Sequence, residues 1–324
     1  MATSVLYAIA RSKAIENKGL TADRLTRLMD CDKLSEMQKI LLEMGYEGND
    51  CFSMKENERN KIYEFLIEVS PNDKATNCFL LKNDYHNAKA LTKAKYLHQE
   101  IDESILIKYA VEDTSKLKEY IYTDNYSYMT EYMSFAMENI DKAFVKGERD
   151  SKIIENELTK AMYKEILSLL KGLELKGIKD YFIDEINFIN ILTALRVREY
   201  KLGESAFLSQ YIEGGIEKNI FLKVLESNND GIYDIMKYTD YVDIIKFALE
   251  DLIQGGAFIN FERETDNYTI KKMKEFKFGD SLLTFYGFII GRFIEIKNVS
   301  IIATAIRSGV DRSQIKLRLR DLYV

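Results

Sequence analysis

Thiol chemistry and metal binding in this sequence would depend on two histidines and three cysteines. His86 and His98 are twelve residues apart, which places them about 120° from each other around a helix. Neither has the Glu-x-x-His or His-Glu-x-x-His spacing of helical metal sites. Cys31, Cys51 and Cys78 are odd in number and form no Cys-x-x-Cys pair, so they indicate reduced thiols in a reducing compartment. We therefore expect no metal site, and a cysteine nucleophile would need a histidine that only the fold could supply.

Phosphate binding and acid–base catalysis have no better basis in the sequence. The P-loop pattern Gly-x-x-x-x-Gly-Lys-Ser/Thr and the dinucleotide pattern Gly-x-Gly-x-x-Gly are both missing. Glycine pairs at 214–215 and 255–256 fall between expected helices and are typical of helix-ending turns. Carboxylate pairs at 184–185 and 250–251 are adjacent, so on a helix they point about 100° apart and do not converge. The sequence predicts no catalytic residues, no cofactor and no direct nucleotide binding.

The composition is that of an acidic, helical protein. Its 324 residues include 16 glycines and one proline, far fewer turn residues than a β-sandwich or barrel needs. The net charge of −6 and the pI of about 5.4 argue against a primary role in nucleic-acid binding. The longest apolar run, 282–290, is far shorter than the ~20 residues of a membrane span, and the first residues lack the pattern of a signal peptide. We expect an all-α protein of the cytoplasm with no transmembrane segment.

Helical periodicity and end signals indicate where the helices lie. In residues 34–44, apolar spacing is combined with a capping-box pattern at Ser35 and Gln38 and with a stop at Gly45. Apolar stripes opposite a polar face predict further helices at 151–170, 241–253 and 261–276.

Two predictions concern the last part of the chain. A final helix is expected after Gly309, beginning at a cap on Asp311 and continuing through Leu322. Gly287 and Gly291 form a Gly-x-x-x-Gly pair, which predicts close helix packing in a soluble core.

An internal repeat is the most informative pattern. Three segments share an acid, an asparagine three residues later, Leu or Ile four after that, and Ala three further on. The asparagines are Asn87, Asn187 and Asn298, and these steps keep all four positions on one helical stripe. A buried structural asparagine, a local cap and a shared partner surface all fit this pattern. The repeat predicts three similar helical domains at 1–125, 126–231 and 232–324.

Basic residues follow the repeated motif near the end of its helix. Lys93 and Lys95 follow the first copy, Arg196 and Arg198 the second, and Arg307 the third. Cations at this position stabilise a helix C-terminus through its dipole. The three arginines are equally candidates for contacts with a partner, and both interpretations stay open.

The order and spacing of several short motifs resemble the C subunit of the archaeal and bacterial V-type (A-type) rotary ATPase, the counterpart of the d subunit in the eukaryotic vacuolar pump. The resemblance covers nearly the whole chain. It departs from the family pattern at Glu213, where a proline is expected, and in the first unit, which has no Gly-Gly pair. The motifs that carry it are Tyr7-Ala-Ile-Ala-Arg11, Asn87-Ala-Lys-Ala-Leu91, Leu195-Arg196 through Gly203, Glu213-Gly214-Gly215, Phe261-Glu262-Arg263 with Asp266, and Glu295-Ile-Lys-Asn298 with 315–318.

This resemblance implies a non-catalytic funnel of three similar helical domains with pseudo-threefold symmetry. A protein of this family lies at the cytoplasmic face of the membrane on the proteolipid ring. The rotor shaft, made of the D and F subunits, enters its cavity, and it transmits torque for ATP-coupled proton or sodium transport. Two other interpretations remain: a stand-alone helical scaffold that binds another protein, and an all-α enzyme whose site only a pocket with converging acids or a cysteine–histidine pair would reveal.

Overall fold

The computed structural model describes residues 3–172, 175–255 and 257–324, and every regular element in these ranges is helical. The all-α prediction is therefore confirmed. The chain divides into two compact units. One unit is discontinuous and combines Met1–Asn72 with Met236–Val324, whereas the other is the continuous segment Asp73–Ile235. The three-domain division and the funnel symmetry stay predictions, because compactness and internal repetition need not coincide.

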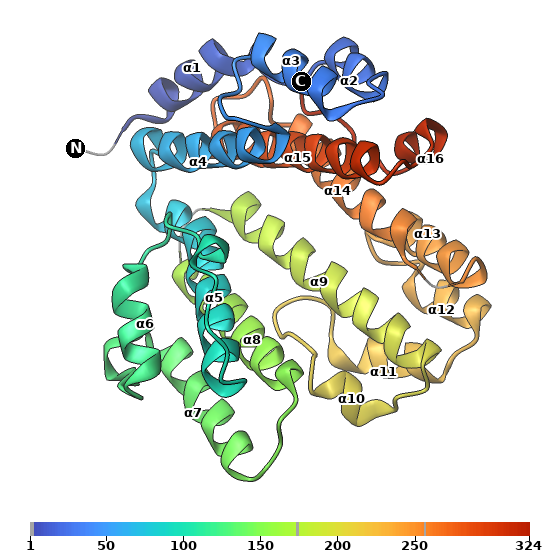
Figure 1. Cartoon of the computed structure of the whole chain (residues 1–324). Coiled ribbons are helices and arrows are strands. Elements are labelled where there is room, and N and C mark those ends of the chain that lie inside the picture. The colour runs from blue at the N-terminus through green and yellow to red at the C-terminus, as the bar shows by residue number, and fades with distance from the viewer. Residues whose placement is uncertain (1–2, 173–174, 256) are drawn as a thin grey trace. The chain divides into compact units, whose positions relative to one another are not determined.

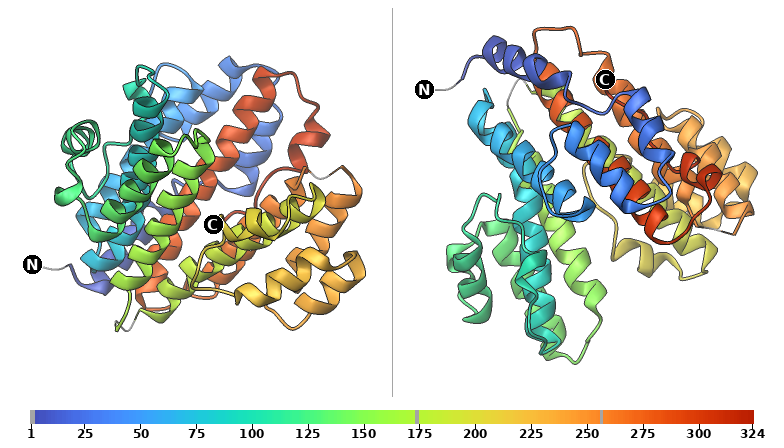
Figure 2. Two further views of the ribbon diagram at one scale, coloured as in Figure 1. Left: turned by 90° about the horizontal axis from the view of Figure 1, so that it is seen from below. Right: turned by 45° about the horizontal axis from the view of Figure 1, so that its top comes forward.

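The discontinuous unit is built around one long, largely buried helix, α15. Its helices, shown in Figure 1, are α1 (Val5–Glu16), α2 (Ala22–Met29), α3 (Leu34–Glu43), α4 (Cys51–Val69), α13 (Val242–Ile253), α14 (Ile259–Lys274), α15 (Leu282–Arg307) and α16 (Arg312–Lys316). α15 packs against α1, α4 and α14 along its length and against α2 and α3 near its end. The N-terminal helices in blue and α15 in red lie side by side in Figure 1 and in the right-hand view of Figure 2.

The core of this unit joins residues from the two ends of the chain. Leu28, Met37 and Leu41 of α2 and α3 are fully buried and belong to one cluster with Val299 and Ile302 of α15. Burying a side chain of this size stabilises a fold by about 1.5–3 kcal/mol relative to leaving it in water. The N-terminal helices therefore depend on α15 for their core, although about 260 residues separate them in the sequence.

The continuous unit contains two long helices with shorter helices packed on each. Its elements are α5 (Asp73–Tyr96), η1 (Glu103–Ile105), α6 (Thr114–Tyr122), η2 (Tyr126–Tyr128), α7 (Glu131–Val145), α8 (Ser151–Leu169), α9 (Lys176–Glu199), α10 (Glu204–Leu208) and α11 (Lys218–Glu226). α5 packs against α6 and α8, and α7 packs against α8. α10 and α11 pack against α9. A last helix, α12 (Asn229–Met236), ends at the boundary with the other unit.

Four of the five helices whose bounds the sequence patterns predicted are located to within two residues. α3, α8, α13 and α14 correspond to the predictions at 34–44, 151–170, 241–253 and 261–276. Gly45 ends α3 with φ of +88°, a backbone conformation that glycine adopts without steric cost. The capping box predicted at Ser35 and Gln38 is wrong, because Lys33 is the N-cap and makes no side-chain cap bond.

The predicted C-terminal helix is wrong beyond its first turns. α16 ends at Lys316, so Leu319 and Leu322 lie outside any helix. Both backbone polar groups of Arg320 bond instead to the side chain of Asn298 on α15. A tertiary contact thus satisfies the groups that a helix would have paired, which overrides the local apolar spacing.

Candidate functional site

The repeated asparagines hold the segments that follow their helices. Asn87 on α5 is fully buried and makes two hydrogen bonds to the backbone of Ile107. Its Oδ1 accepts from the Ile107 N–H at 2.8 Å, and its Nδ2 donates to the Ile107 carbonyl at 2.8 Å. Asn298 on α15 holds Arg320 in the same way, at 2.8 and 3.0 Å. One amide side chain thereby replaces both partners that an extended residue would find in a neighbouring strand.

In α9 the equivalent two-bond contact comes from Asn190. Its Oδ1 accepts from the Ile212 N–H at 2.9 Å and its Nδ2 donates to the Ile212 carbonyl at 2.8 Å. Asn187, one turn earlier, accepts from the Ile216 N–H at 2.7 Å. By its hydrogen bonds, Asn190 is the counterpart of Asn87. The sequence repeat instead aligned Asn187 with Asn87, so the two alignments differ by three residues. This second alignment could have been found in the sequence, because a polar residue lies three positions before each of the three bonding asparagines: Asp84, Asn187 and Glu295.

The polar residue three positions before the asparagine adds a second attachment in the continuous unit. Asp84 is buried and accepts from the N–H groups of Val111 and Glu112, both at 2.8 Å. Burial raises the pKa of the Asp84 carboxyl to about 6, although the two N–H groups oppose this shift. Asn187 takes this role in α9, where the 214–215 glycine pair lets the loop come close. A Cβ atom on Gly215 would lie 2.0 Å from Asn187 Oδ1, so only glycine fits there.

Glu295, the acid of the third segment, belongs to a buried ion network within the discontinuous unit. It pairs with Arg292 one turn earlier on α15, and Arg292 also pairs with Glu58 of α4 at 2.5 Å. Burial raises the pKa of Glu295, whereas the Arg292 charge opposes that shift. A buried ion pair of this kind contributes little net stability but penalises the loss of either partner.

The basic residues at the helix ends have different surroundings. Arg198 is partly buried, and its Nε donates to the carbonyl of Ser227, just after α11, at 2.7 Å. Lys95 likewise donates to the carbonyl of Ile121 in the last turn of α6 at 2.8 Å. Both contacts stabilise the end of a neighbouring helix. Arg196 and Arg307 are exposed, and the Arg307 guanidinium lies 4.7 Å from the centre of the Phe52 ring.

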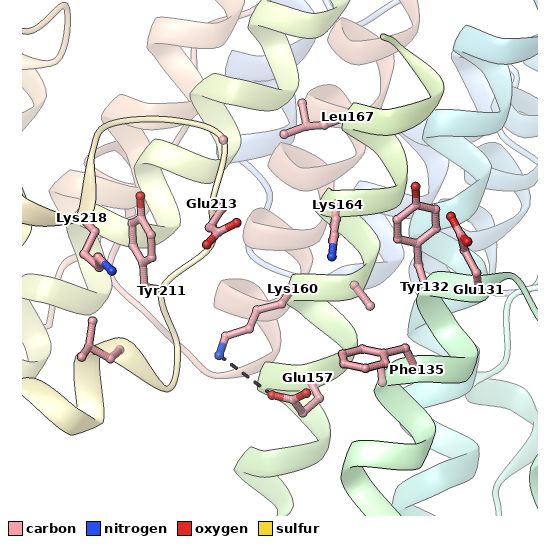
Figure 3. A pocket seen from close by; sticks show the side chains of 14 residues that line it. Glu131, Tyr132, Phe135, Glu157, Lys160, Lys164, Leu167, Tyr211, Glu213 and Lys218 are labelled. Atoms are coloured by element: carbon pink, nitrogen blue, oxygen red, sulfur yellow. Dashed lines mark ion pairs between the residues drawn. The ribbon is translucent and has the colours of Figure 1, made fainter.

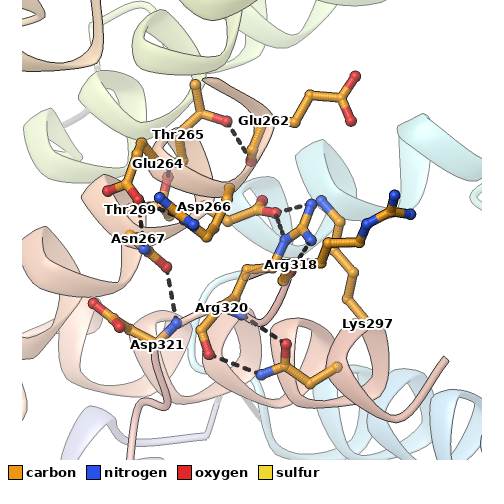
Figure 4. Close-up of polar contacts among 12 residues, drawn as sticks. Glu262, Glu264, Thr265, Asp266, Asn267, Thr269, Lys297, Arg318, Arg320 and Asp321 are labelled. Carbon is orange, nitrogen blue, oxygen red and sulfur yellow. Dashed lines mark hydrogen bonds and ion pairs between the residues drawn. The ribbon is translucent and has the colours of Figure 1, made fainter. Parts of the chain in front are cut away.

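α14 holds the C-terminal segment 317–321 through polar side chains on one face (Figure 4). Arg263 donates to the Leu317 carbonyl at 2.6 Å, and the Asn267 side chain accepts from the Asp321 N–H at 2.8 Å. Asp266 pairs with the buried Arg320 at 2.8 Å. The polar motif of 261–266 therefore serves an intramolecular attachment in this unit.

The Gly-x-x-x-Gly pair of α15 makes room for Tyr323, two residues beyond the segment 317–321. Tyr323 is buried against α15, and a Cβ atom on Gly291 would lie 2.5 Å from its Cβ. Gly287 faces Met273 of α14, where an added Cβ would be 3.3 Å away, a contact that small shifts can absorb. The predicted close packing is present, but the tightest approach is made by the chain end and not by a second helix.

A hollow within the continuous unit has a volume of about 1140 Å³, and Figure 3 shows the side chains that line it. α7 and α8 line one side of it, and residues between Leu208 and Lys218 line the other. Glu157 and Lys160 pair at 3.9 Å, and burial lowers the pKa of the Lys160 ammonium. No histidine or cysteine lines it among the described residues. Its lysines, acids and tyrosines form a polar recess with the exposed ring of Phe135.

The described residues contain no cluster of His, Cys, Asp or Glu that could hold a metal ion. Cys31, Cys51 and Cys78 are all buried and free, and burial raises the pKa of the Cys78 thiol to about 12. His86 is exposed and lies 3.0 Å from the Ile105 carbonyl. No helix in the described ranges is both long and apolar enough to cross a membrane.

A sequence model for the ATP synthase (C/AC39) subunit family matches residues 8–318. The chain belongs to this family. Relatives in the family have modest identity but long matches. The C subunit of a V-type sodium ATPase from Enterococcus hirae is 21% identical over 319 residues, which cover 94% of each chain. The C subunit of an A-type ATP synthase from Desulfurococcus sp. is 24% identical, over 97% of this chain and 90% of that protein.

Some relatives match over shorter stretches. The C subunit of an A-type ATP synthase from Haloferax volcanii is 26% identical over 170 residues. That match covers 51% of this chain and 49% of the archaeal protein. The chain is therefore a member of the C subunit family of A-type and V-type ATP synthases, complexes of several subunits.

Proposed function

We propose that this chain is a non-catalytic central-stalk adaptor of a V/A-type rotary ATPase. It joins the rotor shaft, made of the D and F subunits, to the proteolipid ring in the membrane, and it transmits torque for ATP-coupled proton or sodium transport. The family match over 8–318 carries the proposal, and it is supported by relatives that are named as the C subunits of such complexes.

The internal contacts suit a part that must not deform under load. α5 and α9 each have 24 residues and α15 has 26, so these helices are long struts. The segments that follow them are held at both backbone polar groups by Asn87, Asn190 and Asn298. Because close-packed interiors and doubly bonded loops resist displacement, torque applied at one surface reaches another with little loss.

In this proposal the adaptor lies at the cytoplasmic face, as a peripheral member of the complex between shaft and ring. Arg196, Arg198 and Arg307 are the candidate contacts, of which Arg196 and Arg307 expose their side chains. Arg198 also holds the end of α11, so its replacement would mix a structural effect with a contact effect. Broad surfaces, and not single charges, are expected to carry most of the load.

The test is to remove the chain from the purified or native complex. The head should continue to hydrolyse ATP while ATP-driven ion transport into vesicles is lost, and adding back the wild-type chain should restore transport. Ion transport that continues unchanged without the chain would refute the proposal. Charge reversal of Arg196 and Arg307 to Glu should weaken assembly, whereas the same reversal at the exposed Lys33 and Arg149 serves as the matched control.

A further inference from the structure

A basic turn with one protruding aromatic ring ends α14. We use the name basic turn for residues 271–278. Lys271, Lys272 and Lys274 occupy the last turn of the helix, and Lys277 and Phe278 follow after Glu275 and Phe276. The Phe278 side chain is 85% exposed, which is unusual for a phenylalanine. This concentration of lysine contrasts with the net charge of −6 of the whole chain.

Hydrogen bonds hold the turn in place. The Lys277 N–H donates to the Lys274 carbonyl at 3.1 Å, and the Gly279 N–H donates to the Phe276 carbonyl at 3.0 Å. Thr284 in the first turn of α15 donates its hydroxyl to the same Phe276 carbonyl at 2.7 Å. The backbone that presents Phe278 to solvent is therefore fixed to the buried helix α15, so the exposure of the ring is a built feature.

Two ammonium groups flank the exposed ring. Lys13 of α1 lies 5.9 Å from the centre of the Phe278 ring, and Lys277 lies 5.8 Å from it. Lys277 also pairs with Glu16 at 2.8 Å. Five lysines, four in the basic turn and Lys13, compare with four acids: Glu16, Glu275 and Asp280 nearby in the sequence, and Asp243 of α13, whose charge interacts with Lys271. The surface around the ring keeps a net positive charge.

We propose that the basic turn docks on anionic lipid headgroups, with Phe278 inserted among them and the lysines on the phosphates. An aromatic ring flanked by lysines is the composition of an interfacial membrane anchor. A protein partner would instead require a wider apolar centre around the ring. Within 271–281 the other apolar side chains are buried or half-buried, so Phe278 offers one ring and no such centre. The inference rests on the proposed function, which puts the chain at a membrane surface.

The test is sedimentation of the isolated full chain with vesicles. Vesicles of phosphatidylcholine mixed with phosphatidylglycerol should carry the protein down, and vesicles of phosphatidylcholine alone should not. Binding should fall steeply when salt rises from about 50 mM to about 500 mM, because screening removes the lysine contribution. Because this assay uses the isolated chain, a chain that does not bind vesicles would refute lipid docking and leave the adaptor proposal untouched. Ion transport that continues without the chain would refute the adaptor proposal and leave vesicle binding untouched.

Matched variants separate the ring and the charges from general effects. Phe278→Ala should weaken vesicle binding about tenfold. Lys13→Gln with Lys274→Gln should weaken it about 25-fold, at about fivefold per lysine near the surface. Tyr238→Ala is the aromatic control, since Tyr238 is 88% exposed under the Lys237 ammonium but precedes Asp240 and Asp243. Lys33→Gln with Lys316→Gln removes the same charge from exposed positions elsewhere in the unit.

The proposal is overturned if the chain ignores anionic vesicles at low salt, or if the control pair loses as much binding as the Lys13 and Lys274 pair. It is also overturned if the Phe278 and lysine variants bind vesicles like the wild type but fail to join the complex. That result would assign the basic turn to an acidic protein surface. Circular dichroism on each variant checks that these exposed substitutions leave the fold intact.

Discussion

Single side chains in this protein act mainly by holding backbone. Asn87, Asn190 and Asn298 each bond one backbone N–H and one backbone carbonyl at once, and Asp84 accepts from two successive N–H groups. Gly291 has no side chain, and Tyr323 occupies the space that a side chain there would take. Each of these positions fixes the course of a segment.

Gly291→Ala tests the seat of Tyr323. The new methyl group would lie 2.5 Å from Tyr323 Cβ, so overpacking should destabilise the chain by about 1–3 kcal/mol, measured as a lower urea midpoint. Gly287→Ala on the same helix is the control. There the contact of 3.3 Å is tolerable and alanine gains about 1 kcal/mol of helix propensity. Equal midpoints for the two variants would contradict this account of the glycine pair.

Asp84 should make stability depend on pH. Its folded pKa of about 6 lies above the unfolded value of about 3.9, so the unfolded state releases the proton first as pH rises. The contribution is fully present below about pH 4 and is lost as pH rises through about 6. The stability difference between wild type and Asp84→Asn should therefore fall by about 2–3 kcal/mol over that window, measured by urea unfolding. Parallel pH profiles for the two proteins would rule this out.

At the scale of elements, each long helix positions the extended segment that follows it. α5 holds Ile107, α9 holds Ile212 and α15 holds Arg320, each 20 or 22 residues beyond the asparagine concerned. The same arrangement explains why the apolar spacing around Leu319 and Leu322 did not produce a helix. When the backbone N–H and carbonyl of a segment are already hydrogen-bonded to a side chain, the segment gains nothing from the hydrogen bonds of a helix.

Asn190→Ala tests the register of the second segment. It leaves the buried N–H and carbonyl of Ile212 unpaired, so unfolding free energy should drop by about 2–3 kcal/mol. Hydrogen exchange at the Ile212 amide should accelerate with it. Asn125→Ala, at an exposed position, is the control and should change stability by less than about 0.5 kcal/mol. Protection at Ile212 that survives the change would show that another group holds this loop.

At the scale of the whole molecule, the discontinuous unit joins the two ends of the chain. α2, α3 and the start of α4 share one core cluster with residues of α15, among them Val299 and Ile302. The segment 73–235 is a compact unit whose helices pack on one another, among them α5 with α8 and α7 with α8.

Fragments of the chain can distinguish the two-unit division of the structure from the three-domain division predicted from the repeat. The segment 73–235 expressed alone should be helical and unfold cooperatively on heating. The segment 1–125 should not, because its first helices lack α15 and would expose their core residues to water. Circular dichroism melts of the two fragments measure this. A cooperative melt of 1–125 would favour the three-domain division predicted from the repeat, and a disordered 73–235 would contradict the compact unit.

The helical class, the ends of α3, α8, α13 and α14 to within two residues, and the family all follow from sequence patterns. They depend on local periodicity, on helix-ending residues such as Gly45, and on the order of motifs, and all three are present in the amino-acid sequence. Three features become visible only in the folded chain: the two hydrogen bonds of Asn190, the packing of Tyr323 against Gly291, and the end of α16 at Lys316. Each of these outcomes depends on a partner 20 or more residues away. Local propensity cannot weigh such a partner, because a long-range hydrogen bond or close contact outweighs the few tenths of a kcal/mol per residue that propensity supplies.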